Sequence, residues 1–144
     1  MEAQNYQNHR RYIVGYHIVL FGILVLTQVG TIVNLIECLG NHETLYSASL
    51  LVVLNWCLIM SFFYMRIFAL KAQDRAIRAE ENLRHLALTG KLLDSRLTVR
   101  QIVGLRFASN DEFVALAKRA AEENLSEDAI KREVKSWRAD WHRV

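Results

Sequence analysis

Histidine offers the most chemistry in this sequence, because imidazole can move a proton or bind a metal near neutral pH. The five histidines are His9, His17, His42, His85 and His142. No two are four residues apart and there is no Cys-X-X-Cys, so a zinc site lacks support. His17 lies about one turn inside an uncharged run, where ionisable groups suggest function. It is a candidate axial haem ligand, with a second histidine from a partner. The alternative is an interfacial histidine bonded to a lipid headgroup or a neighbouring helix.

Two amides, Gln28 and Asn55, lie near the middle of two uncharged runs. Counted from the connection between the runs, their depths differ by about three residues, so we expect them to hydrogen-bond across a helical hairpin. A quinone or ion pathway is the alternative, and no carboxylate within the runs supports it. Gly15 and Gly22 lie seven residues apart on one helical face. This spacing predicts close helix packing.

Motifs of common enzymes are missing from the sequence. There is no phosphate-binding loop, no nucleophile elbow and no His-Glu-X-X-His. We therefore expect a protein without enzymatic activity or a bound cofactor. Residues 91–144 hold eleven Lys and Arg against nine Asp and Glu. Such a mixed charged surface argues against a nucleic-acid partner.

Two uncharged runs, residues 12–36 and 44–65, carry most of these candidates. The first has 25 residues, about 37 Å as helix against about 30 Å for a bilayer core. A chain of 144 residues could not bury both runs, and proline is absent. We predict two transmembrane helices joined by a loop at 37–43. The first run is too long for a signal peptide, and no small-residue cleavage site follows it.

Basic residues flank both runs on the side away from the loop. Arg10 and Arg11 precede the first run, and Arg66, Lys71 and Arg75 follow the second, whereas the loop has no Lys or Arg. The positive-inside rule then places the N-terminal segment 1–11 and the tail after residue 65 in the cytoplasm. We expect these five side chains to contact anionic lipid headgroups.

The second helix is expected to continue past the membrane, from about residue 45 to 88, with Thr89-Gly90 as its stop. From Met65 through the cytoplasmic extension, residues 66–90, apolar residues recur at alternating spacings of four and three: Met65, Ala69, Ala72, Ala76, Ala79, Leu83 and Leu86. This heptad pattern is typical of a coiled coil. The alternative is packing against the later helices of the same chain.

Residues 91–144 predict a small cytoplasmic module of three short helices. Thr98 is expected to cap the first, Ser109 with Glu112 has capping-box spacing for the second, and Ser126 should cap the third. The last helix carries an apolar stripe: Ile130, Val134, Trp137 and Trp141. Trp137 and Trp141 either close the module's core or anchor a partner protein.

Three short segments resemble a family of small bacterial membrane proteins catalogued as a domain of unknown function. They are Gln-Asn-Tyr-Gln-Asn-His at 4–9, Leu-Arg-Phe-Ala-Ser at 105–109, and the stretch from Ile-Lys at 130 to Trp-Arg-Ala-Asp at 137–140. The resemblance covers nearly the whole chain. It implies a bacterial inner-membrane protein with two spans, and it carries no activity or catalytic residue with it.

The fold class predicted is an all-α membrane protein: a transmembrane hairpin whose long second helix continues into a small cytoplasmic helical module. The leading functional hypothesis is a non-enzymatic accessory or scaffold subunit in the bacterial inner membrane. Its expected partners are the bilayer and another membrane protein or a second copy of itself. One alternative is a redox-associated subunit that binds haem or quinone through the hairpin. Another is a sensor or regulator that acts through the tail.

Overall fold

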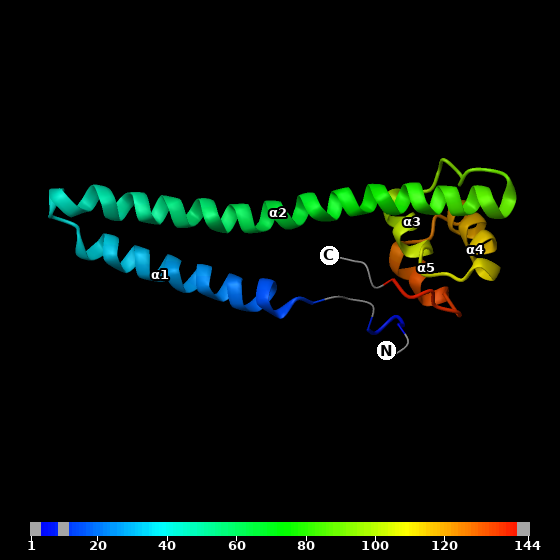
Figure 1. The fold of residues 1–144 in the computed structure, drawn as a ribbon, viewed down its shortest axis with the longest axis horizontal. Helices are drawn as coiled ribbons and strands as arrows, with labels where there is room; N and C mark the ends of the chain where they lie inside the picture. Colours follow the sequence, from blue (N-terminus) through cyan, green and yellow to red (C-terminus); the bar gives the residue numbers. More distant parts are fainter. Residues whose placement is uncertain (1–3, 9–11, 141–144) are drawn as a thin grey trace. The chain divides into compact units, whose positions relative to one another are not determined.

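The computed structural model describes residues 4–8 and 12–140, and these residues form helices without a strand, as the sequence predicts (Figure 1). In chain order the elements are η1 (Gly15–Leu20, a π-helix), α1 (Phe21–Glu37), α2 (His42–Thr89), α3 (Val99–Leu105), α4 (Asn110–Glu122) and α5 (Glu127–Glu133). The chain divides into two compact units. We call residues 12–68 the hairpin unit and residues 1–11 with 69–144 the tail unit. Helix α2 contributes to both.

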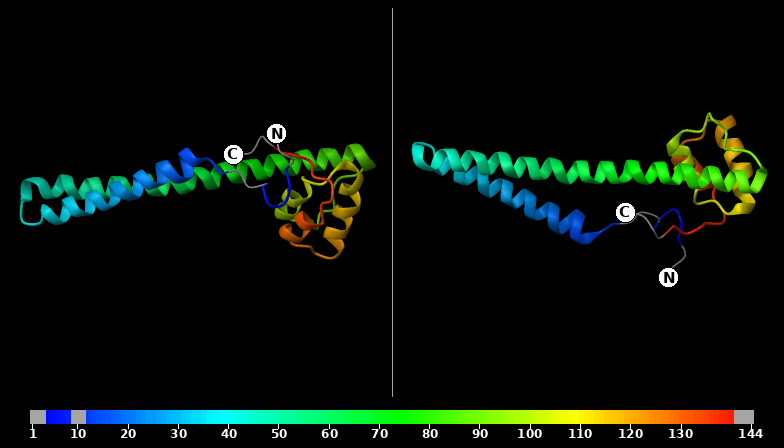
Figure 2. Two further views of the ribbon diagram at one scale, coloured as in Figure 1. Left: turned by 90° about the horizontal axis from the view of Figure 1, so that it is seen from below. Right: turned by 45° about the horizontal axis from the view of Figure 1, so that its top comes forward.

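The hairpin unit consists of η1 and α1 lying beside the first part of α2 (Figures 1 and 2). The helices are connected by residues 38–41 alone, a shorter loop than the predicted 37–43. Gly40 has a φ of +102°, a conformation open mainly to glycine. The side-chain oxygen of Asn41 accepts a hydrogen bond from the Glu43 amide at 3.1 Å. This contact satisfies a free amide at the start of α2 and fixes the turn.

Helix α2 is a single helix of 48 residues. It begins three residues before the predicted start at residue 45 and ends at Thr89, one residue after the predicted last helical residue, 88. Gly90 has a φ of +73°, and its amide donates to the Leu86 carbonyl at 2.8 Å. The predicted glycine stop is therefore confirmed. The helical stretch Gly15–Glu37 and α2 are each long and apolar enough to cross a membrane.

Caps define where the short helices of the tail unit begin. The Thr98 hydroxyl accepts from the Gln101 amide at 3.3 Å, while the Gln101 side chain accepts from the Thr98 amide at 2.8 Å. The Glu112 carboxylate accepts from the Ser109 amide at 3.3 Å, and the Ser126 hydroxyl accepts from the Ala129 amide at 3.1 Å. The three predicted cap positions are confirmed.

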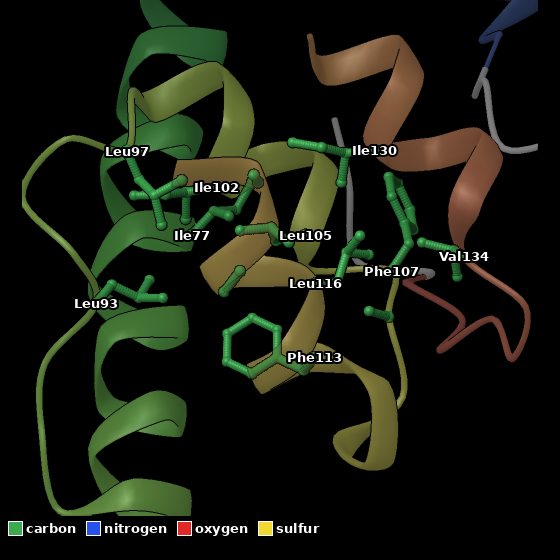
Figure 3. Packing of buried hydrophobic residues seen from close by; sticks show 13 residues of the cluster. Ile77, Leu93, Leu97, Ile102, Leu105, Phe107, Phe113, Leu116, Ile130 and Val134 are labelled. Carbon is green, nitrogen blue, oxygen red and sulfur yellow. The ribbon is translucent and has the colours of Figure 1, made fainter. Parts of the chain in front are cut away.

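The core of the tail unit is apolar and collects side chains from all four of its helices (Figure 3). Its largest fully buried side chains are Phe107, Phe113, Ile102, Leu105 and Ile130. Helix α2 contributes Ile77 to this cluster. The module predicted for 91–144 therefore needs the end of α2 to complete its core.

The prediction that the last helix continues through Val134 and Trp137 is wrong, because α5 ends at Glu133. Val134 is extended, and Trp137 forms an isolated antiparallel bridge with Ala108. The Arg138 amide donates to the Phe107 carbonyl at 2.7 Å. The apolar spacing from Ile130 to Trp137 reflects a chain that leaves the helix and pairs with the segment before α4.

The alternative prediction, that the heptad residues pack against the later helices of the same chain, is also wrong. Ile77 and Glu81 of α2 face the core and are buried. The heptad residues lie on the opposite face of α2: Ala72, Ala76, Ala79, Leu83 and Leu86 are all exposed, and only Ala69 is half-buried. Leu83 keeps 67% of its surface accessible.

Gly104→Ala should destabilise the tail unit by about 1–3 kcal/mol, because α3 and α5 meet at this glycine. A Cβ there would lie 3.1 Å from the Glu127 carbonyl oxygen and 3.3 Å from a methyl carbon of Ile130. Thermal unfolding followed by circular dichroism measures the loss. Gly22→Ala is the matched control, since a Cβ at Gly22 meets nothing within 4 Å. Equal melting temperatures for the two variants would contradict the close approach.

Candidate functional site

The two amides predicted to meet in the hairpin unit are brought together. The Asn55 side-chain nitrogen donates to the Gln28 side-chain oxygen at 2.8 Å and lies 3.1 Å from the Leu24 carbonyl oxygen. Both side chains are buried, although the hairpin is otherwise apolar and largely exposed. An amide pair satisfies part of its hydrogen bonding only when the two helices keep one register. The pair therefore fixes the alignment of α1 and α2.

Asn55→Leu should weaken the contact between the two helices by about 0.6–2 kcal/mol. Gln28→Leu should have a similar effect, because each change removes the same hydrogen bond. A double-mutant cycle in detergent, read by thermal unfolding, isolates the coupling between the two side chains. Strictly additive effects would show that the pair contributes nothing beyond its separate side chains.

His17 lies in η1 with its ring held by local contacts. Its Nδ1 is 3.0 Å from the Ile13 carbonyl oxygen and 3.2 Å from the Ile13 nitrogen. The rings of Tyr12 and Tyr16 lie 4.6 Å and 5.2 Å from the imidazole. Among the described residues, the other nitrogen, Nε2, is buried without a hydrogen-bond partner. A ring nitrogen held by a backbone carbonyl is common in metal-ligating histidines, and haem binding by His17 remains a prediction.

The Tyr16 ring has a second role in the hairpin unit. It stacks on Phe62 with ring centroids 4.3 Å apart, and its hydroxyl donates to the Phe62 carbonyl at 2.5 Å. Phe62 belongs to α2, so this contact ties η1 to the second helix near its open end. The π-helical turn that carries Tyr16 and His17 was not predicted from the sequence.

Gly15 and Gly22 do not lie at a close helix contact within the hairpin unit, and their packing against another helix remains a prediction. A Cβ at either position would meet no atom within 4 Å. Neither glycine therefore lies where η1 or α1 approaches α2 closely. The register of the hairpin depends instead on the amide pair and the aromatic contact.

The basic side chains predicted to contact lipid headgroups differ in how much of their surface is exposed. Arg66 is half-buried, whereas Lys71 and Arg75 are exposed on α2. Arg10 and Arg11 lie outside the described residues. Contact of these side chains with headgroups remains a prediction.

In the tail unit, residues 4–8 pack against α5 and the segment that follows it. The Tyr6 hydroxyl donates to the Asp128 carboxylate at 2.5 Å and accepts from Arg132 Nε at 3.3 Å. The hydrogen bond from Arg132 to Tyr6 raises the pKa of the guanidinium, and Asp128 adds to the shift. The buried Gln4 side chain accepts from the Asp140 amide at 2.8 Å. Two of the three segments that carry the family resemblance are thus in direct contact.

Trp137 lies at the edge of the core and is half-buried. Its ring centroid is 4.9 Å from that of Phe107, so one face of the indole covers the core. The remaining surface borders an open polar cleft, lined by Glu80, Glu81, Arg84, Ser109, Asn110, Asp111, Trp137 and Arg138. Trp137 therefore contributes to the core and also to an accessible surface. Trp141, the other predicted contact residue, lies outside the described residues.

A buried ionic network beneath this cleft was missed from the sequence. Glu81 is 4% exposed, and its carboxylate lies 3.0 Å from Arg84 and 3.6 Å from Arg138. Arg84 also donates to the Ala108 carbonyl at 2.7 Å and lies 4.2 Å over the Phe113 ring. The sequence signal that could have indicated this network is the four-residue spacing of Ile77 and Glu81. This spacing places both residues on the face of α2 that packs against the core. Among the described residues, no cluster of three His, Cys, Asp or Glu could hold a metal ion.

These observations define an all-helical protein in which two helices are long and apolar enough to cross a membrane. The chain belongs to the family described as "Family of unknown function (DUF6526)", which it matches over residues 1–144. The membership expected from its terminal segments is thereby confirmed. No curated protein and no solved structure matches the chain.

Proposed function

We propose that this protein is a two-span integral membrane protein of the bacterial inner membrane, acting as a non-enzymatic accessory or scaffold subunit. The observation that carries the proposal is the exposure of its apolar helices. The most apolar windows of Gly15–Glu37 and α2 are only 6% and 17% buried. A core helix of a soluble protein would be mostly buried, because exposing apolar surface to water costs about 25 cal/mol per Å². A bilayer supplies the missing apolar environment.

The contacts of residues 4–8 support an even number of membrane crossings. Tyr6 and Gln4 precede both long helices, whereas Asp128 and Asp140 follow them, and these residues bond within one compact unit. These contacts support a topology in which residues 4–8 and 128–140 lie on the same side of the membrane. The basic residues that flank the helices favour the cytoplasmic side.

A structural role for the tail is supported by how its charged groups are used. Glu81 pairs with Arg84, and Arg84 in turn contacts Ala108, Asn110 and Phe113. They hold the fold of the tail unit in place. The accessible part of Trp137 beside Arg138 offers an aromatic and basic surface, a composition enriched at protein interfaces.

Two measurements on the full chain test the proposal. Alkaline carbonate extraction should leave the protein in the membrane fraction, while a protein that is merely adsorbed would be released. Affinity purification in mild detergent should recover a second membrane protein in a fixed ratio to this chain. Release by carbonate would refute the membrane assignment. Recovery of this chain without a stoichiometric companion would refute the accessory role.

A further inference from the structure

We propose that the exposed heptad face of α2 is a docking surface for a second copy of this chain, paired in parallel and in register. We call this face the seam: Ala69, Ala72, Ala76, Ala79, Leu83 and Leu86. It lies wholly within the tail unit. The inference rests on the membrane assignment proposed above, which supplies the parallel orientation.

The seam is a continuous apolar stripe that the chain's own helices leave open. The core side of α2 is marked by Ile77 at 6% and Glu81 at 4% exposure. On the opposite face, Leu83 and Leu86 are 67% and 40% exposed, and the three alanines from 72 to 79 are exposed as well. The spacings alternate three and four residues, which is the pattern that packs two helices knobs into holes.

Charges beside the seam favour a second copy as its occupant. With Ala69, Ala76 and Leu83 at position a and Ala72, Ala79 and Leu86 at position d, Arg75 falls at g and Glu80 at e. In a parallel dimer, residue g of one helix faces residue e of the next heptad on the other. Arg75 of each copy therefore faces Glu80 of the other, five residues further along.

Neither charged side chain is committed elsewhere in the described chain. Arg75 and Glu80 are both exposed, and they take part in none of the ion pairs found among residues 4–8 and 12–140. The other flanking positions within the seam, Gln73, Asn82 and Ala87, are uncharged. Parallel pairing thus gains two symmetric Arg–Glu contacts without like-charge repulsion. Antiparallel pairing sets g against g and e against e, and it offers no Arg–Glu contact.

The length of the seam explains why the membrane matters. From residue 69 to 86 it spans about 26 Å of helix, near the lower limit for a coiled coil in solution, and its first half is alanine. Two copies inserted in the same direction share orientation and high local concentration, which lowers the cost of pairing. Small side chains permit the helices to approach closely, with Leu83 and Leu86 providing larger contacts at the far end.

Disulfide crosslinking in membranes tests the seam directly. The full chain carries Cys38→Ser and Cys57→Ala, with one new cysteine at Ala69, at Leu83 or at the control position Arg78. Arg78 is exposed on the same helix but lies away from the seam. Under copper-phenanthroline oxidation, Ala69→Cys and Leu83→Cys should each give at least about fivefold more dimer than Arg78→Cys. Only parallel, in-register pairing brings both positions, 14 residues apart in the sequence, next to their own copies.

Charge reversal then tests the Arg75–Glu80 contact in the Leu83→Cys background. Glu80→Arg and Arg75→Glu alone should each lower the dimer yield about two- to fivefold. The combination Arg75→Glu with Glu80→Arg should restore it. In the crosslinking experiment, three results would overturn the proposal: equal dimer yields at all three cysteine positions, crosslinks at only one of Ala69 and Leu83, or an adduct to a different protein. In the charge-reversal experiment, failure of the double variant to restore the dimer yield would also overturn it. Carbonate extraction of the same membranes separates the two claims: uncrosslinked chain that stays in the membrane overturns the seam and leaves the membrane assignment intact.

Discussion

Phe113→Ala should unfold most of the tail unit, at a cost of about 3–5 kcal/mol. Phe113 is 0% exposed and belongs to the cluster that α2, α3, α4 and α5 share (Figure 3). Its ring also lies under the Arg84 guanidinium at 4.2 Å. Truncation leaves a cavity and removes the aromatic face on which this buried cation packs. The total stability of a module of this size is of the same order as the loss.

Limited proteolysis of the full chain in detergent measures this effect. In the variant, cleavage should appear throughout residues 99–140, while residues 12–68 stay protected as a separate compact unit. Lys118→Ala is the matched control on the same helix, because the Lys118 side chain is 76% exposed and its ion pair with Glu122 is solvated. That change should alter stability by less than about 0.5 kcal/mol. Identical digestion patterns for the two variants would contradict the assignment of Phe113 to the core.

Glu81→Ala should cost about 3–5 kcal/mol, because it leaves the Arg84 cation buried without its carboxylate. The side chains of Glu81 and Arg84 are 5% and 10% exposed, and their charged atoms lie 3.0 Å apart. The expected result is a large drop in the melting temperature of the tail unit.

The replacement Glu81→Leu with Arg84→Leu separates the ionic effect from packing. Removing both charges eliminates the unpaired cation, so the double variant should recover part of the stability that Glu81→Leu alone loses. Recovery should be incomplete, since Arg84 also bonds to Ala108 and Asn110. Thermal unfolding of the wild type, both single variants and the double variant completes the cycle. A double variant at least as unstable as the sum of the single variants would show that the two groups do not depend on each other.

The parts of the fold that follow from local patterns were predictable from the sequence. The absence of proline and the long apolar runs predict helices, and Gly90 marks the end of α2. Thr98, Ser109 and Ser126 mark helix starts because a hydroxyl at the cap position can accept a hydrogen bond from a free backbone amide of the first turn. The meeting of Gln28 and Asn55 followed from counting residues along two helices of known rise.

Features that depend on contacts between distant segments were not predictable. The end of α5 at Glu133 follows from pairing of Arg138 with Phe107, which no local pattern reveals. The docking of Tyr6 on Asp128 joins residues 122 positions apart. Burial of Glu81 depends on which face of α2 packs against the later helices, and the heptad spacing does not reveal that face.

Cysteine labelling in spheroplasts tests whether this chain crosses the membrane twice with both ends in the cytoplasm. The native Cys38, the first residue of the connecting turn, is retained in one variant that carries Cys57→Ala. A second variant carries Lys135→Cys with Cys38→Ser and Cys57→Ala. With this topology, a membrane-impermeant maleimide should label Cys38 in intact spheroplasts and should label position 135 only after permeabilisation. Labelling of position 135 in intact spheroplasts, or protection of Cys38 until permeabilisation, would contradict it.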